Sequence, residues 1–399
     1  MTIRRVVRGI PTLLSMGQGA GPLGEQRDVA VAFDETGVAW IGPDAQAPDA
    51  PEVVDGTGCV ALPPLVDCHT HTVWAGSRSD EFRQRLSGVH YSEILEAGGG
   101  ILSTVRQTRT ASESTLVALA AARLSAMRRR GVGTVEIKSG YGLSVADERK
   151  LLIAAGLAGK QAGVTVLRTF LGAHAVPAEH RADRSAYVEQ VIHEQLPEVQ
   201  AHADFIDAYI DRGAFTVDEG RRILEAGRGA GLGVRVHAEQ VAYTGAAEMA
   251  AGLGALSCDH LERLDADGVH AMAAAGTVGV MLPGAMLYLK DPAPPVAQLR
   301  EAGVPLAVAT DLNPGSSPSG DLWRAMTLAC VLMGLTVEEA LRGATCVAAD
   351  ALGLASEGRL AIGSSSLILC RPQPGEPPEA ASLVQFLDGP AEVRWVQGG

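Results

Sequence analysis

The feature that most constrains this chain is an alternation of short apolar, β-branched runs with segments long enough to form crossover helices. Eight such runs follow one another, at residues 59–66, 132–137, 164–171, 204–210, 233–237, 255–258, 277–282 and 305–309. Helices are expected over 113–130, 146–162, 186–200, 217–230 and 266–275, and after the last run over 321–333 and 337–352. This pattern predicts an α/β fold, either a closed (β/α)8 barrel or an open doubly wound sheet.

The polar residues at the ends of these runs distinguish the two folds. Six of the eight runs have apolar interiors but end in titratable or metal-binding side chains, at 67–71, 138–141, 172–174, 237–240, 259–260 and 311–313. An open sheet gathers such residues near one switch point, whereas a barrel brings all its strand ends to one rim. We therefore predict a TIM-like (β/α)8 barrel with its chemistry at the C-terminal rim.

The two ends of the chain have a different pattern. Short strands broken by Gly and Pro are expected over 4–14, 29–33, 38–41 and 53–60, and again over 359–360, 367–369, 383–387 and 393–396. Neither end has enough apolar surface for its own core, and chain termini often lie close together. We predict that residues 1–60 and 355–399 form one small β-sandwich domain and that residues 61–354 form the barrel.

Composition excludes several classes of function. The formal net charge is −13, and no basic stripe with interleaved aromatic residues is present, which argues against nucleic-acid binding. No apolar run reaches the roughly 18–20 residues of a membrane span. The N-terminus lacks the apolar core of a signal peptide, and the six cysteines are scattered without a Cys-x-x-Cys pair. A cytoplasmic protein without a disulfide framework is expected, and the fold suggests a homodimer.

Four residues at the strand ends have the pattern of a metal site. His69 and His71 flank one residue, so in an extended chain both side chains point the same way. That pair alone fits two unrelated histidines equally well, but His237 ends the fifth run and Asp311 follows the eighth. The first and eighth strands of a closed barrel are neighbours. Three imidazoles and a carboxylate suit Zn²⁺, and the ligand types also fit iron.

Together these motifs resemble those of the amidohydrolase superfamily, and most closely the imidazolonepropionase family, ring-opening enzymes of histidine breakdown. The resemblance is carried by residues 64–71, 98–105, 136–143, 171–174, 236–240 and 309–318, in the expected order along the barrel. The first and fifth stretches are common in the superfamily, whereas 138–142 and 311–317 are much more specific. Residues 364–366, a run of three serines, depart from the Ala-Asp usual before the final strands.

The resemblance implies a metal-dependent hydrolase that opens the cyclic amide of 4-imidazolone-5-propanoate to N-formimidoyl-L-glutamate. It implies one Zn²⁺ or Fe³⁺ per chain. The implied metal ligands are His69, His71, His237 and Asp311, and the implied substrate contacts are Arg78, Tyr141, His174, Gln240, Asn313, Gly315 and Ser316. Some superfamily members bridge two metals with a carbamylated lysine after strand four. Residues 209–212 contain no lysine, so a single ion is expected, and Lys138 after strand two is expected to form a structural ion pair.

Four residues are candidates for the proton transfers. Asp311 is both an expected ligand and a plausible acceptor of a proton from water, and His260 can stabilise an oxyanion or relay a proton. A structural alternative for His260 is a buried histidine bonded to backbone. Gln240 can orient water or substrate but has no charge to act as a base, and Glu239 is either catalytic or a partner that fixes an imidazole.

The substrate's carboxylate requires a local cation in such an acidic protein. Arg78 in a rim loop offers a bidentate fork, although it can also be a surface arginine paired with Asp80 or Glu81. The loop 313–317 supplies an amide, a hydroxyl and backbone N–H groups, or is simply a turn before the next helix. The glycines at 98–100 are expected to form a flexible loop over the barrel mouth.

Two rival functions remain at this stage. Another mononuclear deaminase or cyclic-amide hydrolase on the same scaffold would share the metal ligands and differ in the pocket, and the neutral base that a nucleobase deaminase binds has no carboxylate for Arg78. A barrel kept only as a non-catalytic scaffold would typically have lost metal ligands, whereas all four are present. Substrate comparison separates the first rival, and metal analysis of the purified protein separates the second.

Overall fold

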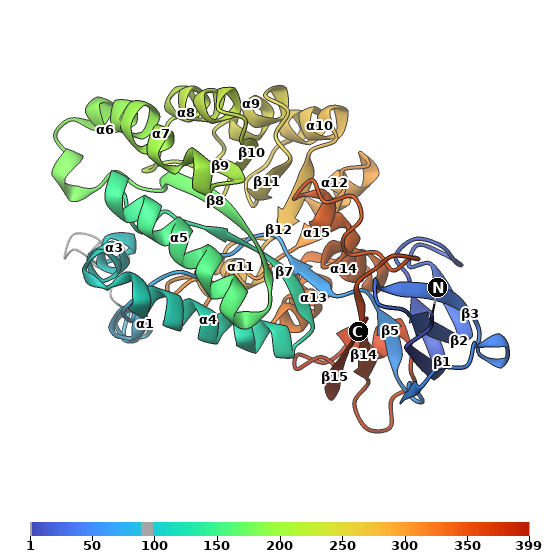
Figure 1. Cartoon of the computed structure of the whole chain (residues 1–399). Helices are drawn as coiled ribbons and strands as arrows, with labels where there is room; N and C mark the ends of the chain where they lie inside the picture. Colours follow the sequence, from blue (N-terminus) through green and yellow to red (C-terminus); the bar gives the residue numbers. More distant parts are fainter. Residues whose placement is uncertain (1, 89–98, 399) are drawn as a thin grey trace.

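The computed structural model describes residues 2–88 and 99–398. Figure 1 shows a large part in which helices surround a group of strands, and a smaller part, made of strands, that contains both chain termini. Of the glycines expected in a loop over the mouth, Gly98 lies outside the described residues.

The large part is the predicted barrel. Its eight parallel strands are β6 (Leu65–Asp67), β7 (Val132–Lys138), β8 (Thr165–Ala173), β9 (Phe205–Ile210), β10 (Gly233–Ala238), β11 (Ser257–His260), β12 (Val278–Met281) and β13 (Leu306–Val308). They pair in this order from β6 to β13. At the rim a parallel bridge joins Thr70 to Leu312, and the His71 N–H donates to the Leu312 carbonyl at 2.9 Å. The segments after the first and last strands are therefore neighbours, as the barrel prediction requires.

Helices cover the outside of this barrel (Figure 1). They are α1 (Ser79–Leu86), α3 (Ile101–Thr110), α4 (Glu113–Arg129), α5 (Val145–Ala162), α6 (Arg184–Gln190), α7 (Leu196–Val199), α8 (Val217–Gly229), α9 (Ala246–Gly252), α10 (Ala266–Ala275), α11 (Pro283–Leu289), α12 (Val296–Glu301), α13 (Leu322–Met333), α14 (Val337–Gly343) and α15 (Cys346–Asp350). Side chains at the N-caps fix several helix starts; Ser112, Ser144 and Thr216 each accept a backbone N–H from the first turn.

Two predicted helices are interrupted. The segment 186–200 contains a π-helical turn at Val191–Gln195 between α6 and α7. The segment 337–352 divides into α14 and α15 because Thr345, with φ −135° and ψ −101°, leaves the helical region. Both differences concern local backbone geometry that apolar periodicity does not encode.

The smaller part is built from both ends of the chain, as predicted. Its strands are β1 (Arg5–Leu14), β2 (Glu25–Phe33), β3 (Val38–Pro43), β4 (Glu52–Asp55), β5 (Val60–Leu62), β14 (Ser366–Arg371) and β15 (Glu392–Gln397). They form one seven-stranded sheet with the order β15-β14-β5-β1-β2-β3, and β4 also pairs with β1. We call it the terminal sheet. One apolar cluster joins residues from both ends of this path, including Val31, Phe33, Leu367 and Leu369.

Four strand predictions are wrong. The predicted strand 53–60 is interrupted after Asp55, because residues 56–59 form the connection between β4 and β5. The run 59–66 is two strands, because Pro63 and Pro64 lack the N–H groups that a continuing ladder needs. Its first half pairs in the terminal sheet and its second half begins the barrel. The segment 383–387 starts within helix α16 (Ala380–Val384), which buries Leu383 and Val384, and residues 359–360 form no strand. Such short apolar runs do not distinguish a helix turn from a strand.

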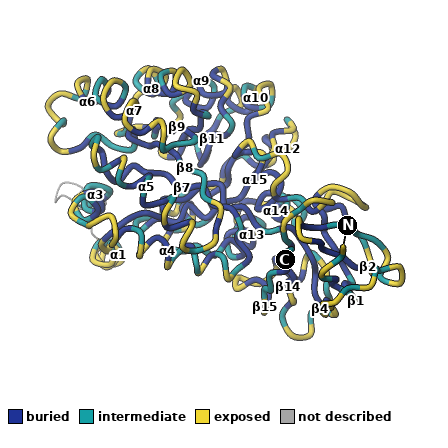
Figure 2. Tube along the Cα trace, in the orientation of Figure 1, coloured by how far each residue is buried: buried dark blue, intermediate teal, exposed yellow. Residues whose placement is uncertain are grey.

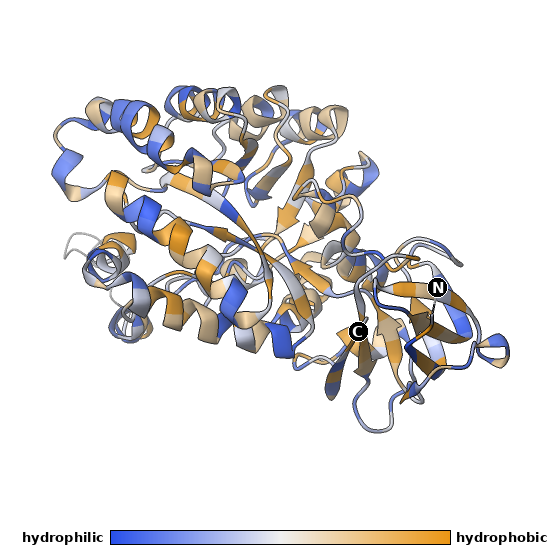
Figure 3. Ribbon diagram, in the orientation of Figure 1, coloured by the Kyte–Doolittle hydropathy of each residue, from blue (hydrophilic) through white to orange (hydrophobic). Residues whose placement is uncertain are grey.

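The distribution of burial follows the layers. Figure 2 shows the barrel strands as buried and the outward-facing parts of the helices as exposed, and Figure 3 shows the corresponding alternation of hydropathy along the helices. In the part of the chain that the structure describes, no helix has the length and hydrophobicity required to cross a bilayer. All six cysteines are described, and each is a free thiol.

Candidate metal centre

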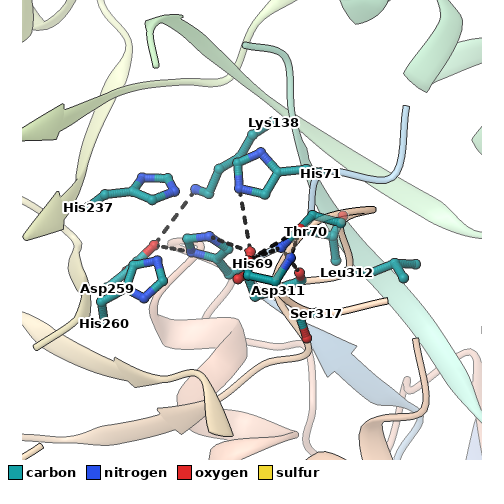
Figure 4. A network of polar contacts seen from close by, with 12 residues as sticks. His69, Thr70, His71, Lys138, His237, Asp259, His260, Asp311, Leu312 and Ser317 are labelled. Carbon is teal, nitrogen blue, oxygen red and sulfur yellow. Dashed lines mark hydrogen bonds and ion pairs between the residues drawn. The ribbon is translucent and has the colours of Figure 1, made fainter. Parts of the chain in front are cut away.

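Three histidines from two distant segments of the sequence meet at the barrel mouth (Figure 4). His69 and His71 follow β6, and His237 lies near the end of β10. All three side chains are buried, and their candidate ligand atoms lie within 4.8 Å of one another. The sequence-predicted cluster of imidazoles is therefore assembled by the fold.

Asp311 lies beside these rings. Its Oδ1 atom is 3.5 Å from Nε2 of His69 and 3.5 Å from Nε2 of His71. Its backbone N–H donates to the His69 carbonyl at 3.0 Å, and its φ of 50° turns the chain at the end of the eighth strand. This backbone contact brings the carboxylate next to the His-x-His segment.

The chemistry of the donor set fits a metal ion. Buried nitrogens of the three rings, Nε2 of His69, Nδ1 of His71 and Nε2 of His237, have no hydrogen-bond partner among the described residues. A buried polar atom without a partner is costly, and a lone pair directed at a cation removes that cost. Burial, aided by Lys138 at His69 and by His174 at His71, lowers the pKa of both imidazoles well below the usual value. Both rings are therefore neutral near pH 7, as metal ligation requires.

Two buried aspartates lie behind the imidazoles. Oδ2 of Asp259 is 2.6 Å from Nδ1 of His69, and Oδ2 of Asp207 is 2.9 Å from Nδ1 of His237. A carboxylate on one ring nitrogen fixes the tautomer and leaves the other nitrogen as a ligand. Neither aspartate was predicted to have this role. The available signal was charge inside apolar runs, because Asp207 lies within the fourth run.

His260 is near the same centre. Its ring centroid is 5.4 Å from that of His237 and 5.8 Å from that of His69. Burial lowers the pKa of His260, but the neighbouring carboxylates of Glu262 and Asp311 outweigh it and the pKa is raised. The predicted structural alternative, a histidine bonded only to backbone, does not describe this ring, because its Nδ1 faces Glu262 at 3.7 Å.

Burial also changes the pKa of the Asp311 carboxyl group. It raises the pKa of Asp311 to about 6, although the charges of His260 and His237 act in the opposite direction. A carboxyl group with a pKa near the working pH can both accept and return a proton. Asp311 and His260 are thus two buried titratable side chains beside the three imidazoles.

Tyr141 and His174 adjoin His71. The His174 ring stacks on His71 with centroids 5.0 Å apart, and the Tyr141 ring lies 5.8 Å from His71 and 5.5 Å from His174. The loop that carries Tyr141 is held by the buried carboxylate of Glu148, which accepts backbone N–H groups from Gly140, Gly142 and Leu143. Sequence reasoning did not identify Glu148, which lies in the first turn of α5.

Arg78 lies next to the 313–317 loop. A Cβ on Gly315 would be 3.0 Å from Nη1 of Arg78, so a larger residue there would press against the guanidinium. Arg78 pairs with Glu81 at 2.6 Å, which was the structural alternative, yet its side chain is only 12% exposed. Its Nε has no hydrogen-bond partner in the described parts of the chain. A cavity of about 330 Å³ includes Arg78 and Gly315 in its lining, together with Trp74 and Tyr288.

Asn313 shapes its own loop. Its Oδ1 accepts the backbone N–H groups of Gly315 and Ser316, both at 2.8 Å, and its Nδ2 donates to the Asp311 carbonyl at 2.8 Å. The amide and these two N–H groups, expected to face the substrate, are thus engaged within the loop. Ser316 also bonds to Asn313, through its hydroxyl at 3.0 Å.

Glu239 and Gln240 follow His237, but Glu239 is turned toward helix α9. Its carboxylate accepts the Thr244 N–H at 2.6 Å and the Ala247 N–H at 3.3 Å. These contacts of Glu239 therefore fix the loop that leads into α9. They do not fix an imidazole. Gln240 is buried, with 8% of its surface exposed.

A family model and curated relatives agree on the lineage of this chain. Residues 60–371 match the model of the amidohydrolase family. An imidazolonepropionase of Polaromonas sp. is 47% identical over 349 residues, covering 86% of this chain and 82% of the relative. One from Cupriavidus taiwanensis is 48% identical over 351 residues, covering 86% of this chain and 84% of the relative.

Solved structures agree on the fold. An adenosine deaminase from Xanthomonas campestris with bound zinc has a TM-score of 0.69 at 18% identity, covering 98% of this chain and 91% of that one. The atrazine chlorohydrolase TrzN from Arthrobacter aurescens complexed with zinc also has a TM-score of 0.69, at 16% identity, covering 98% and 93%. The chain belongs to the amidohydrolase family and, within it, to the imidazolonepropionases.

Proposed function

We propose that this protein hydrolyses the cyclic amide of 4-imidazolone-5-propanoate to N-formimidoyl-L-glutamate. The observation that carries the proposal is the buried group of His69, His71 and His237, whose candidate ligand atoms lie within 4.8 Å of one another, with Oδ1 of Asp311 3.5 Å from Nε2 of His69 and of His71. The relatives that share nearly half of this sequence are named for the same reaction.

In this proposal the four residues hold one Zn²⁺ or Fe³⁺. A bound divalent zinc ion lowers the pKa of a coordinated water molecule to about 7. The Asp311 carboxylate, whose Oδ1 lies 3.5 Å from Nε2 of His69 and of His71, accepts the proton of the water that attacks the ring carbonyl. The same carboxyl group then returns the proton to the ring nitrogen as the C–N bond breaks.

His260 and Arg78 have separate roles in this scheme. The raised pKa of His260 favours a protonated ring, which can donate a hydrogen bond to the carbonyl oxygen as negative charge develops there. Arg78 binds the propionate with the donors that Glu81 leaves free, and Tyr141 and His174 flank the imidazolone ring. Asn313, Gly315 and Ser316 shape the loop against Arg78, and Gln240 orients substrate or water. Glu239 stabilises the loop that carries Gln240.

The test is an assay that follows loss of imidazolone absorbance in metal-depleted and metal-restored protein. We expect turnover that disappears on chelation and returns with Zn²⁺ or Fe. Cytosine, guanine and hydantoins serve as comparison substrates. Turnover of cytosine or guanine in place of imidazolone-propionate would favour the deaminase alternative, because a neutral base leaves Arg78 without a carboxylate. Turnover of hydantoins instead would favour a different cyclic-amide hydrolase.

Several finer predictions remain. We propose the domain division into residues 1–60 with 355–399 and residues 61–354. A homodimer, a cytoplasmic location and the absence of nucleic-acid partners stay predictions from the sequence.

A further inference from the structure

A cluster of charged side chains lies in the barrel interior beneath the candidate metal centre. Its members are Glu136, Lys138, Asp207, Arg235 and Asp259, and each is 0% exposed. They come from four strands of the barrel, β7, β9, β10 and β11; β9, β10 and β11 are direct neighbours, and β8 lies between β7 and β9. We call these five residues the buried charge cluster.

Lys138 has the most carboxylate partners within this cluster. Its Nζ lies 2.9 Å from Oε1 of Glu136, 2.9 Å from Oδ2 of Asp207 and 3.7 Å from Oδ2 of Asp259. Figure 4 shows this ammonium beside the histidines, with a contact to Asp259. The sequence prediction of a structural ion pair for Lys138 named one carboxylate partner, whereas the fold provides three.

Two of these partners contact the expected metal ligands. Oδ2 of Asp259, which faces Lys138, also lies 2.6 Å from Nδ1 of His69. Oδ2 of Asp207, which faces Lys138 as well, lies 2.9 Å from Nδ1 of His237. A single ammonium therefore connects the carboxylates behind two imidazoles that come from different strands.

The other cation of the cluster does not make this connection. Arg235 lies 3.2 Å from Oδ2 of Asp259 and donates to the carbonyls of Cys68 and Ala351, both at 2.7 Å. It thus anchors the cluster to the backbone on one side. Without Lys138, the buried carboxylates of Glu136 and Asp207 would lack their closest cation, and like charges in a low dielectric repel strongly.

We propose that Lys138 is a positioning residue that sets the orientation of His69 and His237 for metal binding, acting through Asp259 and Asp207. The inference rests on the proposed metal centre. It assigns Lys138 a role beyond charge balance, because the ammonium lies within ion-pair distance of an oxygen of each carboxylate, Oδ2 of Asp207 at 2.9 Å and Oδ2 of Asp259 at 3.7 Å. Each oxygen in turn fixes the ring whose remaining nitrogen faces the ion.

A purely compensating charge makes the opposite prediction. Removing a buried positive charge makes the site more negative, so a Lys138 that only balanced charge would, when removed, leave Zn²⁺ affinity unchanged or raise it. Removing a positioning residue lowers that affinity, because the carboxylates and rings no longer share one arrangement. The sign of the change therefore distinguishes the two roles.

The experiment measures Zn²⁺ affinity of metal-depleted full-length protein by competition with a chromophoric chelator. We expect Lys138→Met to weaken Zn²⁺ binding by about 10- to 100-fold. The matched control is Leu224→Ala, which removes a fully buried side chain of α8 away from the cluster and should lower thermal stability without changing Zn²⁺ affinity. An affinity of Lys138→Met equal to or above that of the parent overturns the proposal, as does an equal loss in Leu224→Ala.

Two further variants complete the experiment. One controls for failure to fold, and the other tests whether Lys138 acts through Asp259. Lys138→Met combined with Glu136→Gln removes one charge of each sign, which lowers the cost of unpaired carboxylates, and it should show the same loss of affinity. In a double-mutant cycle, Lys138→Met and Asp259→Asn should lose less affinity together than the sum of their separate losses. Additive losses contradict action through Asp259. A parent protein that binds no Zn²⁺ would refute the proposed metal centre itself, which is a separate result.

Discussion

The barrel mouth and the terminal sheet bury very different side chains. The mouth buries histidines, aspartates, a lysine and an arginine with almost no solvent contact, whereas the core of the terminal sheet consists of apolar residues. Burial of apolar surface stabilises a fold directly, but burial of charge costs free energy unless each charge is paired. The comparison indicates that the mouth is built for chemistry and that the terminal sheet contributes stability.

The sharpest way to test this division is to remove a candidate ligand. His69→Ala and Asp311→Ala should each abolish stoichiometric metal binding and lower kcat/KM by about 10³-fold or more, because the ion and its proton acceptor act on the same step. Metal analysis and the imidazolone assay check this. His193→Ala, at a side chain that is 69% exposed, is the control and should match the parent. Retained turnover in either ligand variant would remove that residue from the centre.

The second prediction concerns Arg78, the arginine at the barrel mouth that is expected to bind the carboxylate of the substrate. Arg78→Ala should lower kcat/KM by about 2–5 kcal/mol in transition-state free energy, since it removes a buried partner of the propionate. Arg83→Ala, in helix α1 directly after Arg78 and exposed, breaks an i,i+3 ion pair with Asp80 and should have no effect. Equal kinetics for the two variants would place Arg78 outside the site.

The third prediction addresses the terminal sheet. Leu369→Ala removes a fully buried side chain from its apolar core and should lower the free energy of unfolding by about 2–5 kcal/mol. Because this core is separate from the mouth, kcat/KM of the folded protein should stay within about twofold of the parent. Denaturant unfolding and the imidazolone assay measure the two quantities. A kinetic loss as large as that of Arg78→Ala would break the proposed division.

The smallest expected effect is a pH dependence of stability from the mouth. Burial, with the charge of His237, lowers the pKa of His174 to about 3, below the usual 6.5. Between these values the unfolded chain binds a proton that the folded protein does not, so stability falls as pH decreases below 6.5. The loss is at most about 1.4 kcal/mol per pH unit. Urea unfolding at pH 7 and pH 5 should show a smaller loss for His174→Asn, and identical losses would contradict the assignment.

The sequence predicted the barrel well because its signal is repetitive. Eight apolar runs, six of them followed by a polar end, encode the same unit many times, so an error in one unit, such as the division at Pro63, does not change the fold. The single errors lie where one short run stands alone, as at 383–387. There, packing of α16 against neighbouring helices decides the structure, and no periodicity reveals it.

The candidate site was predicted unevenly for a physical reason. Residues at strand ends, such as His69 and Asp311, interrupt an apolar pattern and are visible in the sequence. The carboxylates behind them, such as Asp207 and Glu148, depend on which side chain meets which across strands and loops. The direction of the Glu239 side chain depends on its positive φ of 56°, which sequence patterns do not determine.

The proposed function depends on four side chains that surround one ion at the barrel mouth. Anomalous diffraction at the zinc edge from crystals of the zinc-loaded protein tests it most directly. We predict one strong peak per chain, about 2.0–2.2 Å from ring nitrogens of His69, His71 and His237 and from a carboxylate oxygen of Asp311. A peak at another position, or none in crystals grown with excess Zn²⁺, would contradict the claim.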